Sequence, residues 1–381
     1  MAKRLFDIDS HLLAFSARVL SCEARGEEYG VILDETAFAP EGGGQPSDLG
    51  TVGGVAVTNV IEENGELLHL VSTAFPVGEV VACEIDWDRR LRHLQNHTAE
   101  HIVSGLFYRE YGMNNVGFHL GHEDVTLDLD GTVDAEMLRR IELLANVVVA
   151  ENRAVRAYYP AKEELATLFY RSKGDIEGDV RVVEIEGIDA CACCVPHVKR
   201  TGEIGGIRLL SSMRYKGGTR IHMVAGLDAL RVSVSDRNIL NELGNLLSLP
   251  TERIAEGVRK LYDDFGALKF ALGEQKREKI RLLIETLPKE QKTNLFIERG
   301  MDANELRLLA LGAMEKTGGE VAAFSGDDAE GYRFVLASPV AFEERAAALR
   351  QSLPVKGGGK APVLQGTAVC TEAEIRAFFK E

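Results

Sequence analysis

The sequence predicts an α+β protein that begins with a small N-terminal β-barrel and ends in an α/β domain. Three observations support this prediction. Short β-rich segments fill residues 1–88, helical and strand-like patterns alternate over 89–230, and a long helical period of apolar residues follows at 231–289, before a mixed segment at 290–381. The 381 residues, 45% of them hydrophobic, provide enough material for several cores.

The N-terminal segment has β-rich stretches at 17–22, 29–33, 55–60 and 80–85, with Gly, Asp, Asn and Pro between them. Short strands with frequent turn signals are typical of a small barrel or a sandwich. We therefore expect a β-barrel domain over residues 1–88.

The second segment predicts a helix from Thr98 to Tyr111 and another from Asp134 to Glu151, where apolar residues recur at helical spacing. Expected strands lie near residues 154–158, 181–187, 204–210 and 219–225. This alternation predicts an α+β domain over residues 89–230.

The third segment predicts a helix at 227–248, before Pro250, and then a seam of apolar residues at steps of four and three. The seam consists of Ile254, Val258, Leu261, Phe265, Leu268 and Leu272. This period is typical of a coiled coil or helical hairpin, and a core helix has a similar pattern. We expect a helical hairpin linker at 231–289. The seam would pair within the chain or between chains, so a homodimer through it or through the C-terminal domain is consistent with the sequence.

The last segment, residues 290–381, predicts a separate α/β domain. It has helical patterns at 304–317 and 342–353 and strand-like patterns at 320–324 and 333–337. Three glycines, Gly357 to Gly359, stand between Lys356 and Lys360 and predict a turn that enters a strand. Such a turn can present backbone N–H groups to a phosphate, and a mobile loop is the other interpretation.

The net charge of −15 argues against general affinity for nucleic acid. One local basic patch stands out, with the single acid Glu203 inside it. It comprises Lys199, Arg200, Arg208, Arg214, Lys216 and Arg220. The patch predicts either a local RNA contact or solvated strand faces.

No apolar run is long enough to span a membrane, and the N-terminus becomes acidic too early for a secretion signal. The sequence therefore predicts a cytoplasmic protein with no membrane partner. Six cysteines are too few for a disulfide scaffold, and Cys191, Cys193 and Cys194 crowd beside a histidine. In a reducing compartment this crowding indicates metal binding or thiol chemistry.

Two half-sites carry the strongest chemical signal. His97-Thr-Ala-Glu-His101 and Cys193-Cys-Val-Pro-His197 each place two metal-binding side chains four residues apart. Residues four apart share one helix face, and three histidines with one cysteine match the ligand set of tetrahedral zinc. We predict that these four residues bind Zn²⁺ if the fold joins them. Cys191 and Cys194 compete for the place of Cys193, and His93 is either a supporting partner or a packing residue.

A third constellation runs from Thr36 to Gln45. Gly42, Gly43 and Gly44 permit unusual backbone angles and close approach of a ligand, and Gln45 and Thr36 add polar side chains. A plain β-turn is the alternative. The sequence contains no DHH triplet, no phosphate-binding P-loop and no G-x-S-x-G elbow, so it supports no phosphoesterase, P-loop ATPase or serine hydrolase.

In this order these motifs resemble the alanyl-tRNA editing proteins, which are freestanding relatives of the editing domain of alanyl-tRNA synthetase. The matching pieces are Glu41-Gly-Gly-Gly-Gln45, His97-x-x-x-His101, Cys193-x-x-x-His197 and Thr201-Gly-Glu-Ile-Gly205. The resemblance covers about residues 5–226. The last segment resembles, more weakly, the synthetase's C-terminal domain, also appended to DHH phosphoesterases, through Gly357 to Gly359 and Gln365-Gly. One departure is Cys193-Cys-Val-Pro-His197, where the family usually has Cys-Gly-Gly-Thr-His.

The resemblance implies a zinc-dependent enzyme that edits in trans, a deacylase for tRNA(Ala) mischarged with serine and also with glycine. Thr36 would recognise the serine hydroxyl, because a site built to bind that hydroxyl rejects alanine. Gln45, Gly43 and Gly44 would position the ester or the terminal adenosine. The basic residues Lys199, Arg200, Arg214 and Lys216 would contact the acceptor stem.

Two other functions fit the same residues. The first is a zinc-organised RNA-binding module without catalysis. The second is a metal hydrolase for another aminoacyl-tRNA, since threonyl-tRNA synthetase carries a similar histidine and cysteine pattern.

Overall fold

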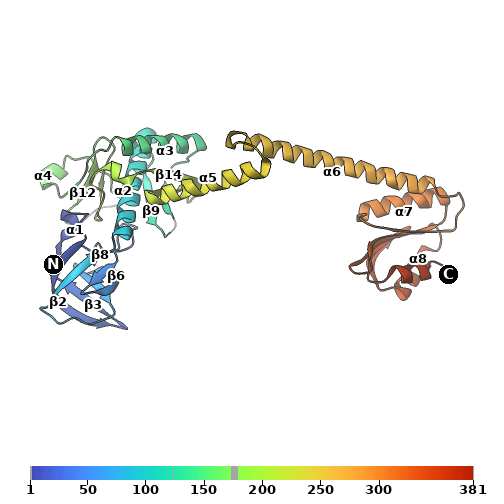
Figure 1. Ribbon diagram of the computed structural model, residues 1–381, viewed down its shortest axis with the longest axis horizontal. Helices are drawn as coiled ribbons and strands as arrows, with labels where there is room; N and C mark the ends of the chain where they lie inside the picture. Colours follow the sequence, from blue (N-terminus) through green and yellow to red (C-terminus); the bar gives the residue numbers. More distant parts are fainter. Residues whose placement is uncertain (1, 123, 173–178, 381) are drawn as a thin grey trace. The chain divides into compact units, whose positions relative to one another are not determined.

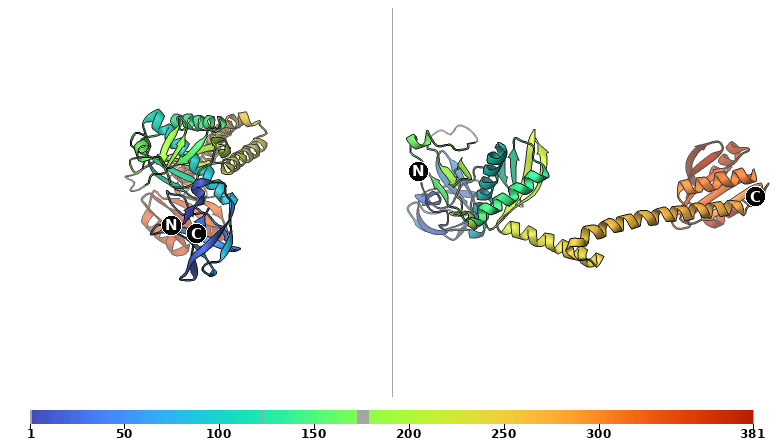
Figure 2. Two further views of the ribbon diagram at one scale, coloured as in Figure 1. Left: turned by 90° about the vertical axis from the view of Figure 1, so that its left-hand side faces the viewer. Right: turned by 90° about the horizontal axis from the view of Figure 1, so that it is seen from above.

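The computed structural model describes residues 2–122, 124–172 and 179–380. The chain divides into two compact units, Met1–Asn241 and Glu242–Glu381, which we describe separately (Figures 1 and 2). The predicted α+β class is confirmed, because both units combine helices with β-sheets. Along the part of the chain that is described, no helix is long and apolar enough to cross a membrane.

The first unit begins with a closed barrel of strand order β2-β3-β7-β6-β5-β8. Its strands are β2 (Ala14–Arg25), β3 (Glu28–Leu33), β5 (Gly50–Val52), β6 (Val55–Glu63), β7 (Glu66–Val71) and β8 (Val80–Ile85). Four of them contain the β-rich stretches found in the sequence. Sequence analysis missed strand β7. Four of its six residues are buried, so the strand shows no alternation of apolar and polar residues. Before and beside the barrel lie β1 (Lys3–Arg4), α1 (Leu5–Ile8) and β4 (Glu35–Thr36), and β1 pairs with β4.

Helix α2 (Trp87–Tyr111) leads out of the barrel and carries the first metal half-site (Figure 1). The helix starts eleven residues before the predicted start at Thr98, because polar residues in its first turns hide the apolar period. The Asp86 carboxylate caps its N-terminus by accepting a hydrogen bond from the backbone N–H of Arg89. The fully buried Arg90 pairs with Asp48, at 2.5 Å, and so ties the helix to the loop that follows β4.

The rest of the first unit packs two sheets and a helix against α2. A four-stranded antiparallel sheet has the order β14-β15-β10-β9, and a three-stranded sheet has the order β11-β12-β13. The elements are β9 (Asn115–Leu120), β10 (Val125–Leu129), α3 (Ala135–Ala150), β11 (Val155–Tyr158), α4 (Lys162–Leu165), β12 (Val182–Ile185), β13 (Asp189–Ala192), the 3₁₀ turn η1 (Thr201–Ile204), β14 (Ile207–Tyr215) and β15 (Gly218–Ala225). One continuous core joins α2, α3 and the four-stranded sheet, so α2 is enclosed. Sequence analysis missed β9, β10 and β13.

The second unit is a five-stranded sheet of order β16-β17-β18-β20-β19 with helices on both faces (Figure 2). Its elements are β16 (Thr293–Glu298), α7 (Ala303–Thr317), β17 (Glu320–Asp327), β18 (Gly331–Ala337), α8 (Phe342–Ser352), β19 (Val355–Lys360), β20 (Val363–Ala368) and α9 (Glu372–Phe378). Alternate residues of β17 serve two cores: Val321 and Ala323 face the core with α7, and Ala322 and Phe324 face the core with α8 and α9. Strand β16, which sequence analysis missed, pairs parallel to β17.

The structure corrects the prediction of a glycine turn. Gly357 to Gly359 lie inside edge strand β19, where they pair with residues 364–366 of β20. A side chain on Gly357 would meet the backbone oxygen of Gln365 at 2.2 Å, and one on Gly359 would meet that of Val363 at 2.0 Å. Gly357 and Gly359 are therefore required by close strand pairing, which a local sequence pattern does not reveal.

The segment between the two sheets is helical, as the sequence predicts. Helix α5 (Leu227–Leu247) is followed by a 3₁₀ turn, η2 (Thr251–Arg253), and by α6 (Ile254–Glu285). Ile254, the first seam residue of α6, is buried, but the seam residues after it are exposed: Val258 by 46%, Leu261 by 58%, Phe265 by 66%, Leu268 by 69% and Leu272 by 55%. This exposure is the opposite of what a core helix would show.

Candidate metal centre

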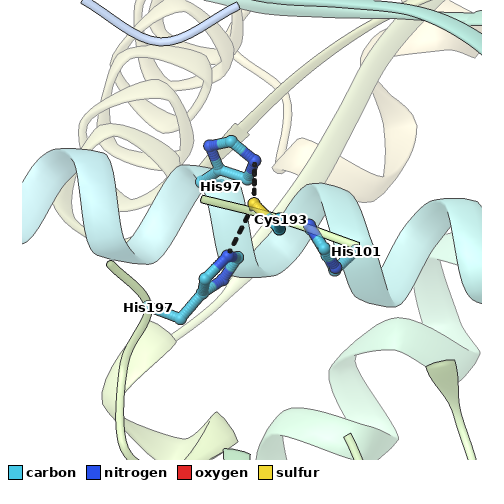
Figure 3. A group of neighbouring side chains, drawn as sticks. All are labelled: His97, His101, Cys193 and His197. Atoms are coloured by element: carbon cyan, nitrogen blue, oxygen red, sulfur yellow. Dashed lines mark hydrogen bonds between the residues drawn. The ribbon is translucent and has the colours of Figure 1, made fainter. Parts of the chain in front are cut away.

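The fold joins the two half-sites. His97 and His101 lie one turn apart on α2, and Cys193 and His197 lie on the loop that leaves β13 (Figure 3). Their four ligand atoms lie within 4.8 Å of one another. The Sγ of Cys193 is 3.6 Å from Nε2 of His97 and 3.3 Å from Nε2 of His197. A tetrahedral zinc with N and S ligands has ligand-to-ligand distances of about 3.5 Å, so the cluster fits such an ion.

Each histidine is oriented by a partner at its other ring nitrogen. Nδ1 of His97 donates to Oε1 of Gln45 at 2.9 Å. Nδ1 of His101 lies 3.2 Å from the Asp189 carboxylate. The Thr98 hydroxyl donates to a backbone oxygen and can accept from Nδ1 of His197 at 3.1 Å.

Gln45 and Thr98 offer acceptor oxygens at Nδ1 of His97 and His197, and the Asp189 carboxylate faces Nδ1 of His101, so the Nε2 atoms are the ones turned toward the metal position. Partners of this kind fix both the tautomer and the direction of a metal-binding histidine. The arrangement is therefore that of a prepared metal site and not that of three unrelated core histidines.

Asp189 is itself held by Arg171. The guanidinium of Arg171 binds both carboxylate oxygens, at 2.7 and 2.9 Å, and also donates to the Ser104 hydroxyl at 2.7 Å. Gly105 on α2 makes this approach possible, because a side chain there would meet the Cβ of Asp189 at 2.8 Å. Asp189, Cys191 and Cys193 alternate along an extended segment, so one face carries all three. That alternation was the sequence signal that could have revealed Asp189.

Neighbouring histidines favour the thiolate form of Cys193, which is the form that binds a metal. Burial opposes the thiolate of Cys193, but His97, His197 and His101 outweigh it and hold the pKa of this thiol well below its ordinary value. Burial lowers the pKa of His197 to about 3, which keeps its imidazole neutral. A thiolate and neutral imidazoles are the protonation states that bind zinc.

The competing cysteines lie elsewhere. Cys191 groups with His101 and Asp189, whereas Cys194 is an exposed residue near Gly42. His93 is buried with Nδ1 3.9 Å from Asp48, and it makes no contact with the four ligands among the described residues. It is a packing residue, one of the two roles considered from the sequence.

The bulky loop between Cys193 and His197 fits into the fold because two of its side chains point into the protein interior. Val195 is 1% exposed and Pro196 is also buried. Arg181 holds the loop by donating to the backbone oxygens of Cys193 and Val195, at 3.0 and 2.9 Å. The departure from the usual Gly-Gly-Thr therefore leaves the ligand spacing intact.

The glycine loop lies against the cluster. Backbone hydrogen bonds between Gly42 and Gln45 close a tight turn. Gly44 has φ of +82°, and a side chain there would meet the backbone oxygen of Phe118 at 2.3 Å, so only glycine fits. Gly43 approaches the ring of His97 and lines the cavity beside the ligands.

Gln45 is 2% exposed, and its amide nitrogen Nε2 finds no acceptor among the described residues. A buried donor without a partner is costly, so this atom is suited to a ligand.

Thr36 lies on β4 beside the barrel and is fully buried. Its hydroxyl pairs with Nε2 of His69 at 2.8 Å and accepts the backbone N–H of Phe38 at 3.1 Å. His69 uses its other nitrogen to donate to the Val31 backbone, and burial lowers its pKa to about 4, so it is neutral and accepts the threonine proton. The Thr36 oxygen keeps one lone pair, and its role in serine recognition stays a prediction.

Several of the predicted basic contacts are engaged within the protein. Lys199 pairs with Asp9 at 2.8 Å, and Arg200 donates to the backbone oxygen of Asn152. Arg220 binds Asp128 through two hydrogen bonds of 2.7 Å. The acidic partners of Lys199 and Arg220 lie outside residues 199–226. A count of charges within that segment therefore overstates its positive charge. Arg214 and Lys216 lie at the end of the β14–β15 hairpin.

Comparison with known proteins gives the context for this site. Residues 180–222, which include Cys193 and His197, match the family described as threonyl and alanyl tRNA synthetase second additional domain. Residues 11–89 match the class II (A) tRNA synthetases.

Full-length relatives agree with these matches. The chain is 28% identical to the alanyl-tRNA editing protein Aarsd1 of Danio rerio, over 98% of this chain and 96% of that protein. It is 29% identical to Aarsd1-A of Xenopus laevis, over 93% and 88%. The chain is similar, over nearly its whole length, to these alanyl-tRNA editing proteins. An alanine–tRNA ligase of Pyrococcus furiosus is 33% identical over 75% of this chain but only 32% of its own length.

This similarity explains why the two half-sites, 92 positions apart, occur in one chain. Both lie in the segment of this chain that the structure folds as one unit. The buried His/Cys cluster is the feature of this chain that can bind a metal.

Proposed function

We propose that this chain hydrolyses the ester bond of tRNA(Ala) mischarged with serine, and also with glycine, and that zinc bound by His97, His101, Cys193 and His197 is required. The similar proteins are named alanyl-tRNA editing proteins, which supports an ester hydrolase over an RNA-binding module without catalysis. The observation that carries the proposal is the orientation of three histidines so that each Nε2 is free beside a thiolate.

The protein residues have separate tasks in this reaction. When bound by His97, His101, Cys193 and His197, zinc would supply positive charge that attracts the carbonyl oxygen or the amino group of the ester. The buried Nε2 of Gln45 donates a hydrogen bond to the carbonyl oxygen, whose negative charge grows as water adds to the carbonyl carbon. The bond to the ribose then breaks, and the ribose oxygen leaves with a proton from that water. Gly43 leaves room for the ester beside His97.

Selectivity for serine would come from Thr36. The hydroxyl of Thr36 is oriented by His69, so the free lone pair of its oxygen has a fixed direction. A site that hydrogen-bonds a substrate hydroxyl can reject the analogue that lacks it by ~10⁴-fold. Alanine lacks the hydroxyl, and so correctly charged tRNA(Ala) would survive. Glycine lacks it too, so the glycyl ester should be hydrolysed more slowly than the seryl ester.

The test is deacylation of Ser-tRNA(Ala), Gly-tRNA(Ala) and Ala-tRNA(Ala), with and without a chelator. We expect hydrolysis of the seryl ester that the chelator abolishes, and little hydrolysis of the alanyl ester. Thr36→Val should reduce the preference for the seryl ester without loss of metal. Equal rates for the seryl and alanyl esters, or rates that ignore the chelator, would contradict the proposal. A preference for a non-cognate tRNA would instead indicate a hydrolase for another aminoacyl-tRNA.

For the second unit we propose two supporting roles. Lys356 and Lys360 lie within the exposed edge strand β19, on either side of its three glycines, which supports a tRNA-holding role for the predicted DHH-associated-like domain at 290–381. The exposed seam of α6 supports a homodimer through paired α6 helices. Light scattering should give twice the chain mass, and Leu261→Glu should give the mass of one chain. A single-chain mass for the unchanged protein would reject the dimer.

A further inference from the structure

The cavity at the metal cluster is much larger than an amino acid needs. Its volume is about 1030 Å³, and it is lined by His97, His101 and Cys193 at one part and by aromatic residues at another. The seryl group would fill only a small part of this space. The remainder must accommodate whatever the ester is attached to, so its lining indicates which chemistry lies next to the ester.

Two stacked rings stand out in that lining. The rings of Tyr108 and Phe169 lie 5.9 Å apart between centroids, with 26° between their planes, and both line the cavity. Phe169 is 70% exposed although it is wholly apolar. Tyr108 supports one side of this ring, and much of the rest of the side chain is open. A supported and exposed aromatic ring beside a ligand cavity is a typical platform for an unpaired nucleic-acid base.

The position of the rings matches one nucleoside. Tyr108 follows His101 by seven residues on α2, which is two helical turns or about 10 Å along the same side of the helix. An aminoacyl ester at the cluster is joined through one ribose to the base of the terminal nucleotide. The base therefore lies one sugar away from the ester, and α2 spans this separation as a rigid helix.

We propose that Phe169, supported by Tyr108, is the stacking platform for the terminal base of the aminoacyl-tRNA. This inference rests on the proposed function, because it places the nucleoside that carries the ester. Stacking is tolerant of base identity, so the platform contributes affinity and position, whereas Gln45 and Thr36 act on the ester and the amino acid.

Binding tests the platform without catalysis. Uncharged tRNA(Ala) with 2-aminopurine in place of its terminal adenine should lose fluorescence on binding, because stacking quenches this base. We expect Phe169→Ala to weaken the quenching and to lower affinity about tenfold, and Phe169→Tyr to retain both. Phe270→Ala is the matched control, because Phe270 is also 70% exposed but lies on α6, outside the seam and the cavity. Equal quenching in Phe169→Ala and the unchanged protein would overturn the proposal.

Kinetics then separate stacking from a structural effect. For 3′-O-seryl-adenosine, Phe169→Ala should raise KM about tenfold and leave kcat nearly unchanged. For a seryl ethyl ester, which has no base, the same variant should match the unchanged protein. An equal loss on both esters would show that the ring only maintains the fold, and would overturn the inference. If the unchanged protein hydrolyses neither ester nor Ser-tRNA(Ala), the proposed function fails, and the quenching experiment still decides whether Phe169 binds a base.

Discussion

Two long helices of this chain have opposite relations between sequence pattern and burial. Helix α2 carries many polar residues, yet 16 of its 25 residues are buried, including Arg90, His97 and Glu100. Helix α6 has the regular apolar seam of a packed helix, yet only Ile254 and Ile280 of its 32 residues are buried. Each helix is described within its own unit.

The difference shows which properties of a helix can be predicted from the period of its hydrophobic residues and which cannot. Period alone predicts that a helix forms and which face is apolar, but it does not say whether another surface covers that face. Buried polar groups require specific partners, because an unpaired one costs about 1–3 kcal/mol. A helix that buries Arg90, Asn96 and three histidines must therefore serve a defined site, whereas the exposed face of α6 is available to a partner.

The largest expected effect compares the same substitution in the two helices. Leu106→Ala removes a fully buried side chain from α2 and should lower the free energy of unfolding by about 2–5 kcal/mol. Leu261→Ala removes a side chain that is 58% exposed and should change it by less than about 0.5 kcal/mol in a single chain. Urea unfolding of both variants measures the contrast at a protein concentration low enough to keep the chain monomeric, because the proposed α6 dimer would cover Leu261. A similar loss in both would mean that α6 is packed in solution.

Acid should affect the first unit more than the second. All nine histidines precede residue 242, and burial lowers the pKa of His93, on α2, to about 4, against the opposing effect of Asp48. The fold therefore prefers neutral His93. Its contribution is fully present above pH 6.5 and is lost as the pH falls from 6.5 to 4, by up to ~3 kcal/mol.

Urea unfolding between pH 7.5 and 4 checks this direction. His93→Gln should lose less stability than the unchanged protein over that interval, whatever its stability at pH 7.5. An identical pH dependence in both proteins would show that His93 does not control the acid response.

A smaller effect is expected for the support of the metal ligands. Asp189→Asn keeps the shape of the side chain but removes the charge that faces His101 and Arg171. Loss of such a partner weakens metal binding by about 10–100-fold. A competitive zinc titration measures this affinity, and Asp179→Asn, a change to a cavity-lining residue outside the ligand cluster, is the control. An unchanged affinity in Asp189→Asn would remove Asp189 from the site.

Much of the fold could be predicted because it is local. The helix at 303–317 and the strand at 80–85 follow directly from periodicity and flanking turn residues. The start of α2 could not be predicted this way, because its first turns gain their burial from the barrel through Arg90 and Asp48. The strand at 355–360 could not be predicted for a similar reason, since its glycines pair with the neighbouring strand β20 and do not form a local turn.

The candidate site divides in the same way. The four ligands could be proposed because their spacing within each half-site is local, and Gln45 could be proposed from its glycine loop. Asp189 left a signal in its alternation with Cys191 and Cys193. Arg171 and Thr98 left none, since their roles depend on contacts between segments that only the fold brings together. The role of the basic patch could not be decided from its own segment, because several of its members pair with acids from distant segments.

The central claim is that α2 buries its histidines in order to bind a metal together with Cys193. Loading the purified protein with Co²⁺ and recording its visible spectrum tests this claim most directly, because thiolate coordination and tetrahedral geometry leave characteristic absorption. We expect one Co²⁺ per chain with a tetrahedral spectrum and a thiolate-to-metal band that disappears in Cys193→Ala and persists in Cys194→Ala. Absence of bound metal, or the same spectrum in Cys193→Ala, would contradict the account.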